Sequence, residues 1–441
     1  MQEQVVRLDG RSLYDVIMSE DVNMLNETVV IGYGTMIRKD LTSSIAQVDG
    51  EALTERASGL NILQNMAGKM AGVKVTSFSG RPGGSTNIRV RGFGSINASN
   101  DPLYVVDGAV GVSSDMINSA DIESISVLKD AASTAIYGAK GANGVVLITT
   151  KSGKRDDGTI TYDGKFGAGL MTRKVHMMDA DEYIQMQALA YGYSGQQLPH
   201  LVTPMENLFY YKKDSADNYV YDDNGLLIAS PIYDTDWWKE STRTAITQDH
   251  NLSFSRGNDK SSVYANVGYQ DVQGLVKTTY GRRLSATVNA TAKINRWLEI
   301  NGLISMAETQ NNSSDQEGTM MQGAVRNINE MPPIVPVKYP DGTWGRKDDY
   351  PLSESASNPI QQLEYFKILN KNSHILGNMG LTFHIIDGLD LNVNGNVQLN
   401  DAKTADYRKE GLVNWSESST GNQAYITNGH ILRWSNEEYF T

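Results

Sequence analysis

The sequence predicts a transmembrane β-barrel of the outer-membrane type, with about eight antiparallel strands in its C-terminal part and an α/β unit before them. The first observation is strict alternation: residues 284–294 and 389–400 place mostly Leu, Val and Ala on one face and Asn, Thr, Ser and Gln on the other. A strand between lipid and a wet lumen has this pattern. A soluble β-sandwich or β-helix also alternates, although sandwich strands are shorter, about 5–6 residues. Alternation alone leaves these fold classes open.

The second observation is the length of the connectors. The alternation predicts strands near residues 159–170, 244–256, 261–273, 282–294, 298–310, 372–385, 389–402 and from 424 onward. The connectors at 257–260, 295–297 and 387–388 are tight, whereas those at 171–243, 311–371 and 403–423 are long. Short turns on one rim and long loops on the other are typical of outer-membrane barrels, so the connectors favour the membrane fold. In the first long loop, Asp179–Ala190 predicts a short helix that packs rather than binds.

Residues 35–155 mix strand and helix signals. Val73–Val75 and Ile88–Val90 are strand-like and flank a Gly/Pro/Ser turn cluster, and PLYVVDG and ESISVLKD predict two more strands. Asp130 is a predicted N-cap for AASTAIY, and Gly138 suits a left-handed position at the end of that helix. The run VVLI at 145–148 predicts a strand buried on both faces.

Composition excludes several classes of protein. The 441 residues hold 39 Lys and Arg against 51 Asp and Glu, a net charge of −12, which argues against nucleic-acid binding. With no cysteine there is no disulfide scaffold, Cys-based zinc site or thiol catalysis, and 6 His make a His-rich metal site unfavourable. Met1–Gly10 lacks an apolar leader core, so we expect the chain to begin inside a longer protein.

Several motifs together resemble one family. LNETVVIGYGT, IRVRGFGSIN, PLYVVDG, DIESISVLKDAASTAIYGAKGANGVVLITTKSG and HNLSFS followed by a GNDK turn resemble the SusC-like (SusC/RagA-type) TonB-dependent outer-membrane transporters. The resemblance covers nearly the whole chain and is densest at residues 25–155.

The resemblance implies four segments. Residues 1–24 would end a carboxypeptidase-regulatory-like β-sandwich extension, 25–34 would hold the TonB box and a linker, 35–155 the plug domain, and 156–441 the N-terminal part of the barrel. A plugged barrel has about 22 strands, so the predicted strands form an incomplete wall. We therefore expect the chain to be a portion of a transporter that cannot transport alone, with a free edge at its last strand.

The family implies energy-coupled import of a large nutrient across the cell outer membrane. The substrate would be a glycan or a peptide, and the partners would be TonB with its inner-membrane complex, a SusD-like surface lipoprotein and outer-membrane lipid. No cofactor, metal or catalytic residue is implied. The alternatives are a siderophore or cobalamin receptor of the same architecture, a secreted β-rich glycoside hydrolase and a non-functional remnant.

The predicted TonB box is Glu27, Thr28, Val29, Val30 and Ile31. Adding a peptide to the edge of a partner sheet requires an extended, β-prone segment, and Thr-Val-Val-Ile is β-branched throughout. The alternative for the same residues is an ordinary strand.

Other candidates lie in and after the plug. Arg89 and Arg91 are two residues apart on a predicted strand, and the resemblance implies that they face carboxylates of the barrel wall; solvated charges are the alternative. The Gly-rich plug loops supply the candidate substrate contacts Arg81, Ser95, Asn97 and Asn100, although plain turns explain them equally well.

Two further groups have competing explanations. Trp237 and Trp238 are candidate substrate contacts that could stack on sugar rings, although an interfacial aromatic girdle explains them better. A carboxylate pair for glycoside hydrolysis could come from Asp101, Asp107, Asp121 and Asp130. Each of these four also fits a turn, a helix start or an N-cap.

Overall fold

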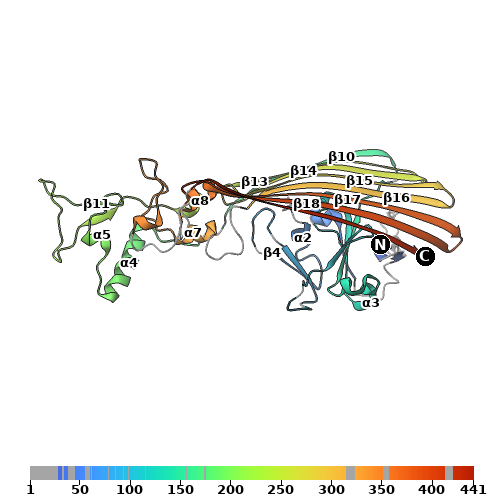
Figure 1. Cartoon of the computed structure of the whole chain (residues 1–441), viewed down its shortest axis with the longest axis horizontal. Coiled ribbons are helices and arrows are strands. Elements are labelled where there is room, and N and C mark those ends of the chain that lie inside the picture. The colour runs from blue at the N-terminus through green and yellow to red at the C-terminus, as the bar shows by residue number, and fades with distance from the viewer. Residues whose placement is uncertain are drawn as a thin grey trace, which may run out of the picture.

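The computed structural model describes residues 28–441 apart from 32–33, 38–44, 55–59, 61, 78, 85, 93, 98, 115, 155, 173–174, 314–322, 351–356 and 413–420. Its largest element is an eight-stranded sheet in which every strand pairs antiparallel with its neighbour in chain order (Figure 1). The strands are β10 (Asp156–Gly169), β13 (Ala245–Gly257), β14 (Ser261–Gln273), β15 (Tyr280–Asn295), β16 (Leu298–Asn312), β17 (Phe366–Ile386), β18 (Leu389–Arg408) and β19 (Gln423–Phe440). These bounds confirm the eight predicted strands. The expected extension at 1–24 lies outside the described residues.

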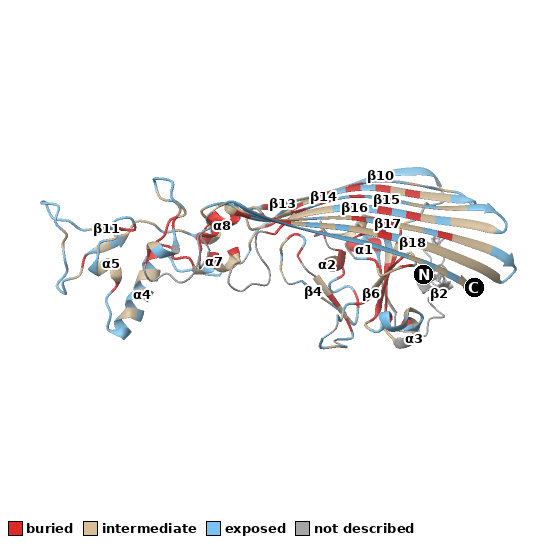
Figure 2. Ribbon diagram, viewed as in Figure 1, coloured by how far each residue is buried: buried red, intermediate tan, exposed pale blue. Residues whose placement is uncertain are grey.

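The sheet, called the wall below, is open in the part of the chain that the structure describes. β10 and β19 each pair with one strand only, so they form its two edges. The wall is curved, and the α/β unit lies against its inner face (Figure 1). Alternate strand positions are buried where the wall overlies this unit (Figure 2). This arrangement agrees with a partial barrel around a plug.

Two strands are longer than the alternation predicted. β17 begins at Phe366 rather than near residue 372, and β18 continues to Arg408 rather than to 402. On these added segments Lys371 pairs with Lys403, two residues beyond the pair formed by Ser373 and Asp401. The apolar face that marked the predicted strands does not reach these segments, so alternation could not detect them.

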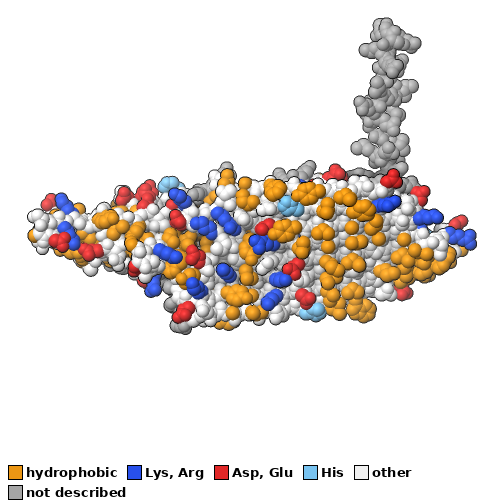
Figure 3. All heavy atoms as spheres, turned by 90° about the horizontal axis from the view of Figure 1, so that it is seen from above, with side chains coloured by type: hydrophobic (Ala, Val, Ile, Leu, Met, Phe, Trp, Pro, Cys, Tyr) orange, Lys and Arg blue, Asp and Glu red, His pale blue; other side chains and the backbone are white. Residues whose placement is uncertain are grey.

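The outer face of the wall carries rows of apolar side chains (Figure 3). In β15, Leu284, Val288 and Ile294 are 56%, 46% and 57% exposed. Residues 284–294 span about 34 Å along a strand, or about 24 Å along the membrane normal at a tilt of about 45°. That height matches the apolar band of about 25 Å on outer-membrane barrels.

The plug contains a five-stranded mixed sheet and a separate hairpin. The sheet order is β3 (Ile45–Asp49), β8 (Ile122–Leu128), β9 (Val145–Thr150), β6 (Leu103–Val106) and β7 (Ala109–Val110). The hairpin pairs β4 (Val73–Ser77) with β5 (Thr86–Val90), as predicted, and α1 (Gly50–Thr54) and α2 (Ile62–Asn65) precede it. The central strand, β9, runs parallel to β6 and antiparallel to β8, and its first four residues are buried. The predicted doubly buried strand is confirmed.

The helix after Asp130 is shorter than predicted. Asp130 is the N-cap, and its side chain accepts a hydrogen bond of 2.9 Å from the Ser133 backbone N–H. α3 covers only Ala131–Thr134 and is followed by a 3₁₀ segment, η4 (Ala135–Gly141). Gly138 has φ 58° and ψ −146°, which is not the left-handed helical conformation that the sequence predicted. It introduces a kink within the segment instead.

The long connectors at one end of the wall fold into a cap, residues 179–242, 323–350 and 357–365 (left in Figure 1). Its elements are α4 (Ala180–Ser194), α5 (Pro199–Val202), β11 (Phe209–Tyr211), β12 (Ala229–Pro231), α6 (Trp237–Ser241), α7 (Ala324–Glu330), η5 (Lys347–Asp349) and α8 (Pro359–Tyr365). The predicted helix is confirmed as α4, and Asp179 caps it in a capping box with Glu182. None of the helices in the described part of the chain is both long and apolar enough to span a membrane.

Candidate functional site

The predicted TonB box forms one strand of a hairpin. β1 (Thr28–Ile31) pairs antiparallel with β2 (Gly34–Ile37), and Val29 lies opposite Met36. Among the described residues this sheet has two strands, so β1 has one edge without a paired strand. The extended backbone agrees with the sequence, whereas binding of TonB stays a prediction. Glu27 lies outside the described residues.

The plug is attached to the wall through a buried carboxylate. Asp121 ends the 3₁₀ turn η3 (Ser119–Asp121) and is 0% exposed. Its Oδ1 accepts hydrogen bonds from Asn266 Nδ2 at 2.7 Å and from the Tyr264 hydroxyl at 3.1 Å, both on β14. Burial raises the pKa of this carboxyl, and hydrogen bonds from wall side chains oppose the rise. Sequence analysis gave Asp121 only a local role and missed this contact.

Asn118 makes a second attachment beside it. Its Nδ2 donates to Asn251 Oδ1 on β13 at 2.8 Å and to Ser285 Oγ on β15 at 3.0 Å. Gly268 on β14 lies directly below, and a Cβ at that position would overlap the side chains of Asn118 and Asn251. A side chain at residue 268 would therefore force the Asn118 and Asn251 amides to move and would disturb their hydrogen bond. Asn118 and Asp121 together join the plug to β13, β14 and β15.

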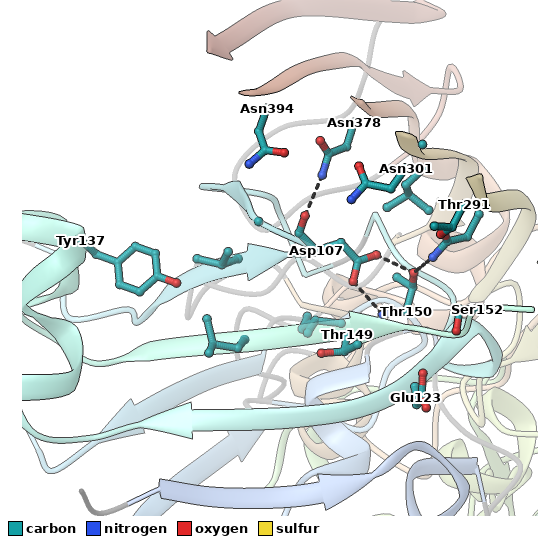
Figure 4. Close-up of a pocket in the computed structure, with 17 residues that line it drawn as sticks. Asp107, Glu123, Tyr137, Thr149, Thr150, Ser152, Thr291, Asn301, Asn378 and Asn394 are labelled. Atoms are coloured by element: carbon teal, nitrogen blue, oxygen red, sulfur yellow. Dashed lines mark hydrogen bonds between the residues drawn. The ribbon is translucent and has the colours of Figure 1, made fainter. Parts of the chain in front are cut away.

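A polar cavity of about 310 Å³ separates the plug from another part of the wall (Figure 4). Asp107, at the end of β6, accepts hydrogen bonds from Thr150 through its carboxylate, at 3.0 Å from the backbone N and 2.5 Å from Oγ1. Its backbone carbonyl accepts a hydrogen bond of 2.7 Å from Asn378 Nδ2 on β17, and Asn289 Nδ2 donates to Thr150 Oγ1 at 3.0 Å. Other polar lining residues are Glu123, Tyr137, Ser152, Thr291, Asn301 and Asn394. Burial raises the pKa of Asp107, while the bonds from Thr150 lower it.

The prediction that Arg89 and Arg91 both lie on one strand is wrong for Arg91. β5 ends at Val90, and Arg91 follows it with φ 58°, so the alternation of the strand does not continue to that residue. Arg89 pairs with Asp101 of the plug at 2.5 Å. This bond lowers the pKa of Asp101 against the opposing effect of its partial burial. That either arginine seats the plug against wall carboxylates stays a prediction.

The candidate substrate loop is held by its own polar groups. Asn100 Oδ1 accepts hydrogen bonds from the backbone N–H groups of Gly94 and Ser95, and Asn100 Nδ2 donates to the Ser95 carbonyl. The Asn97 backbone N–H donates to Ser95 Oγ at 3.3 Å. Asn100 thus shapes the loop. Arg81 is half-buried in the other Gly-rich loop, and substrate contact by these residues stays a prediction.

The two tryptophans lie in the cap, one of them buried. Trp237 is 4% exposed in the cap core, and its Nε1 donates to the Pro332 carbonyl at 3.0 Å. Trp238 packs partly buried against that core and donates to Asn329 Oδ1 at 3.0 Å. Stacking of Trp237 on a sugar is therefore excluded by its burial. Trp238 is only partly buried, so its contact with substrate and an interfacial position both stay predictions.

The four carboxylates considered for hydrolysis are engaged in structural contacts. Asp101 pairs with Arg89, Asp107 accepts from Thr150, and Asp130 caps α3. Asp121 binds the wall. Each carboxylate therefore has a role in folding that requires no chemistry.

Comparison with known proteins agrees with this architecture. Residues 38–145 match the family described as the TonB-dependent Receptor Plug Domain. The chain is 31% identical over 450 residues to the TonB-dependent receptor SusC of Bacteroides thetaiotaomicron, covering 95% of this chain and 41% of that protein. It is 33% identical over 393 residues to the TonB-dependent receptor P26 of Formosa agariphila, covering 84% of this chain and 34% of that protein.

A solved structure extends the similarity to three dimensions. The RagAB peptide importer in its "open-open" state matches with a TM-score of 0.76 and 26% identity, over 94% of this chain and 46% of that one. The chain thus spans less than half the length of each of these relatives.

Proposed function

Because the chain belongs to the SusC-like TonB-dependent receptors of the outer membrane, we propose that the whole protein imports a large polar nutrient by an energy-coupled, TonB-dependent mechanism. The nutrient is a glycan or a peptide. The similarity to a peptide importer supports the peptide, and the similarity to SusC is compatible with either.

The observation that carries the proposal is a folded plug fixed to the inner face of a membrane wall. The wall has an apolar outer face, and its inner face is bound to the plug through Asp121 and Asn118. A plug in the lumen blocks diffusion, so passage requires work on the plug. TonB would supply that work by pairing with residues 27–31 and transmitting energy from the inner membrane.

The cap supplies a candidate capture surface. A cleft of about 960 Å³ opens there, lined by the rings of Tyr219, Tyr233, Tyr339 and Trp344. The Glu206 carboxylate on its edge accepts a hydrogen bond of 2.8 Å from the Tyr219 hydroxyl. Aromatic rings with oriented carboxylates suit a ligand rich in hydroxyl or amide groups. A SusD-like surface lipoprotein would deliver the nutrient to this side.

The test uses cells that produce the whole protein and two probes, a fluorescent hexasaccharide and a fluorescent hexapeptide. We expect accumulation of one probe that ceases when TonB is deleted or when a protonophore collapses the inner-membrane gradient. A matched control strain lacks only this protein.

Three results would contradict the proposal. Uptake that persists without TonB would mean that transport is not energy-coupled. TonB-dependent uptake of a ferric siderophore or cobalamin, with neither probe taken up, would favour the alternative receptor class. Cleavage of the hexasaccharide by the purified protein would favour the hydrolase.

A further inference from the structure

The plug contacts the wall in two different ways. Against β13–β15 the contacts join side chain to side chain: Asp121 with Asn266, which is buried, and Asn118 with Asn251 and Ser285, which is half-buried. The Asp121 carboxylate accepts two hydrogen bonds from β14, and hydrogen bonds to a charged group are stronger than those between neutral groups. This side is the stronger attachment.

The connection between the plug and β10 also holds the plug to β13 and β14. The segment from the plug into β10 passes along β13, where the Lys154 backbone N–H donates to Ser255 Oγ at 2.8 Å. Gly153 fits so closely against β13 and β14 that a Cβ would overlap the backbone of Arg256 and Val263. The plug is therefore tied covalently and sterically to this part of the wall.

Against β16–β18 the contacts are of another kind, and a cavity of about 310 Å³ interrupts them. Asn378 Nδ2 donates to the Asp107 carbonyl at 2.7 Å, and Gln398 Nε2 donates to the Val110 carbonyl at 3.2 Å. Both bonds join neutral groups, and neutral hydrogen bonds are weaker than those to a charged group. Leu303 and Leu376 also pack against the plug core. The buried Asp107 carboxylate beside the cavity is held by Thr150 of the plug itself, so these separations leave its hydrogen bonds in place.

The wall beside the cavity carries a row of neutral polar groups. In the register, Thr291 lies opposite Asn301, Asn301 opposite Gly380, and Gly380 opposite Asn394. The amides of Asn301 and Asn394 fill the space that a side chain at Gly380 would take. Amides donate and accept hydrogen bonds without holding a net charge, so they bind hydroxyl or peptide groups weakly and reversibly.

We propose that during import the plug stays attached to β13–β15 while it separates from β16–β18, and that the solute passes along the row of neutral polar groups formed by Thr291, Asn301 and Asn394. This inference rests on the proposed function and adds the side of the wall on which the path opens. The solute carries hydroxyl or amide groups, which glycans and peptides share.

The test locks each side in turn. One whole-protein variant carries Asn118→Cys and Ser285→Cys, and the other carries Val110→Cys and Gln398→Cys; these 441 residues contain no other cysteine. Each pair is joined in cells by a bis-maleimide whose spacer is cleaved by a reductant. Uptake of the fluorescent hexasaccharide and hexapeptide is measured before and after cleavage, with single-cysteine variants treated identically.

We expect the lock between residues 118 and 285 to leave uptake within twofold of the single-cysteine controls. The lock between residues 110 and 398 should lower uptake at least tenfold, and cleavage should restore it, which shows that the variant is folded. An equal loss of uptake in both locked variants, or no loss of uptake with the lock between residues 110 and 398, would overturn the inference. TonB-dependent uptake by the wild type would still uphold the proposed function. Absence of TonB-dependent uptake in the wild type would overturn both.

A second pair of variants tests the row of neutral polar groups. Asn301→Leu with Asn394→Leu should lower uptake of the transported probe at least tenfold, and the probe that is affected identifies a glycan or a peptide. Asn436→Leu is the control. Asn436 lies on the edge strand β19 opposite Gly395, the residue after Asn394, so its side chain faces the other side of the sheet from that of Asn394. An equal effect of both substitutions, or none from the double variant, would contradict the assigned path.

Discussion

Asp121 of the plug and Asn266 of the wall are 145 residues apart in sequence, yet their side chains are joined by a buried hydrogen bond of 2.7 Å. Asp121→Ala should destabilise the seated plug by about 1–3 kcal/mol, because Asn266 and Tyr264 would keep buried donors without an acceptor. The measurement is protease sensitivity of the plug in the purified whole protein. Glu123→Ala removes an exposed carboxylate two residues away and should have no effect; equal sensitivity in both variants would contradict the prediction.

Gly268→Ala should displace the plug. The added Cβ would overlap Asn118 and Asn251, and overpacking of this kind costs about 1–3 kcal/mol. Gly377→Ala is the matched control on β17, where a Cβ would meet no atom within 4 Å. Hydrogen exchange of residues 116–121 should rise in the first variant only. Unchanged exchange in Gly268→Ala would show that the close approach is not required.

The cap should lose stability at low pH through His200. Its ring stacks on Phe209 at 4.0 Å between centroids, and burial lowers its pKa from 6.5 to about 4. His200 binds a proton more readily in the unfolded cap than in the folded cap. The free energy of unfolding of the cap is therefore highest above pH 6.5 and falls by up to about 3 kcal/mol towards pH 4. Thermal unfolding of the cap between pH 7 and pH 4 measures this loss. His200→Gln should flatten the dependence, while His176→Gln, at an exposed position, should not.

Val29→Pro should abolish uptake without reducing the amount of protein in the outer membrane. Proline removes the backbone donor of Val29 from the strand that TonB would use. Val29→Thr keeps the donor and the β-branched shape, and it should transport normally. Energised uptake by Val29→Pro at the wild-type rate would show that residues 27–31 are not the TonB box.

Residues 1–441 produced alone should not form a closed barrel. The edges β10 and β19 would leave rows of unpaired backbone groups in hydrocarbon, each costing several kcal/mol. Electrophoretic mobility with and without heating tests this expectation, with the whole protein as the control. A heat-modifiable band from this segment together with restored uptake would contradict it.

Sequence analysis succeeded where the signal was local. Alternation located all eight wall strands because successive residues of each strand face two different environments. It also identified Asp130 as an N-cap, since the capping bond joins residues three apart. Gly138 was misjudged because a positive φ is compatible with more than one glycine conformation.

The failures concern contacts between distant segments. Arg89 pairs with Asp101, which lies in the loop after its own strand, and the sequence did not indicate this partner. Trp237 was assigned to solvent or the membrane interface, but a carbonyl 95 residues away accepts its hydrogen bond inside the cap. Alternation says which way a side chain faces and nothing about the partner it meets. Asp121 was missed for the same reason.

The bond between Trp237 and Pro332 also has a consequence for the order of assembly. The two residues lie on either side of β13, β14, β15 and β16 in the chain, so closing the cap core brings together the two ends of this four-strand segment. Its closure is a late, long-range step, and such contacts form slowly. A closed cap therefore reports that the chain before β13 and the chain after β16 have met.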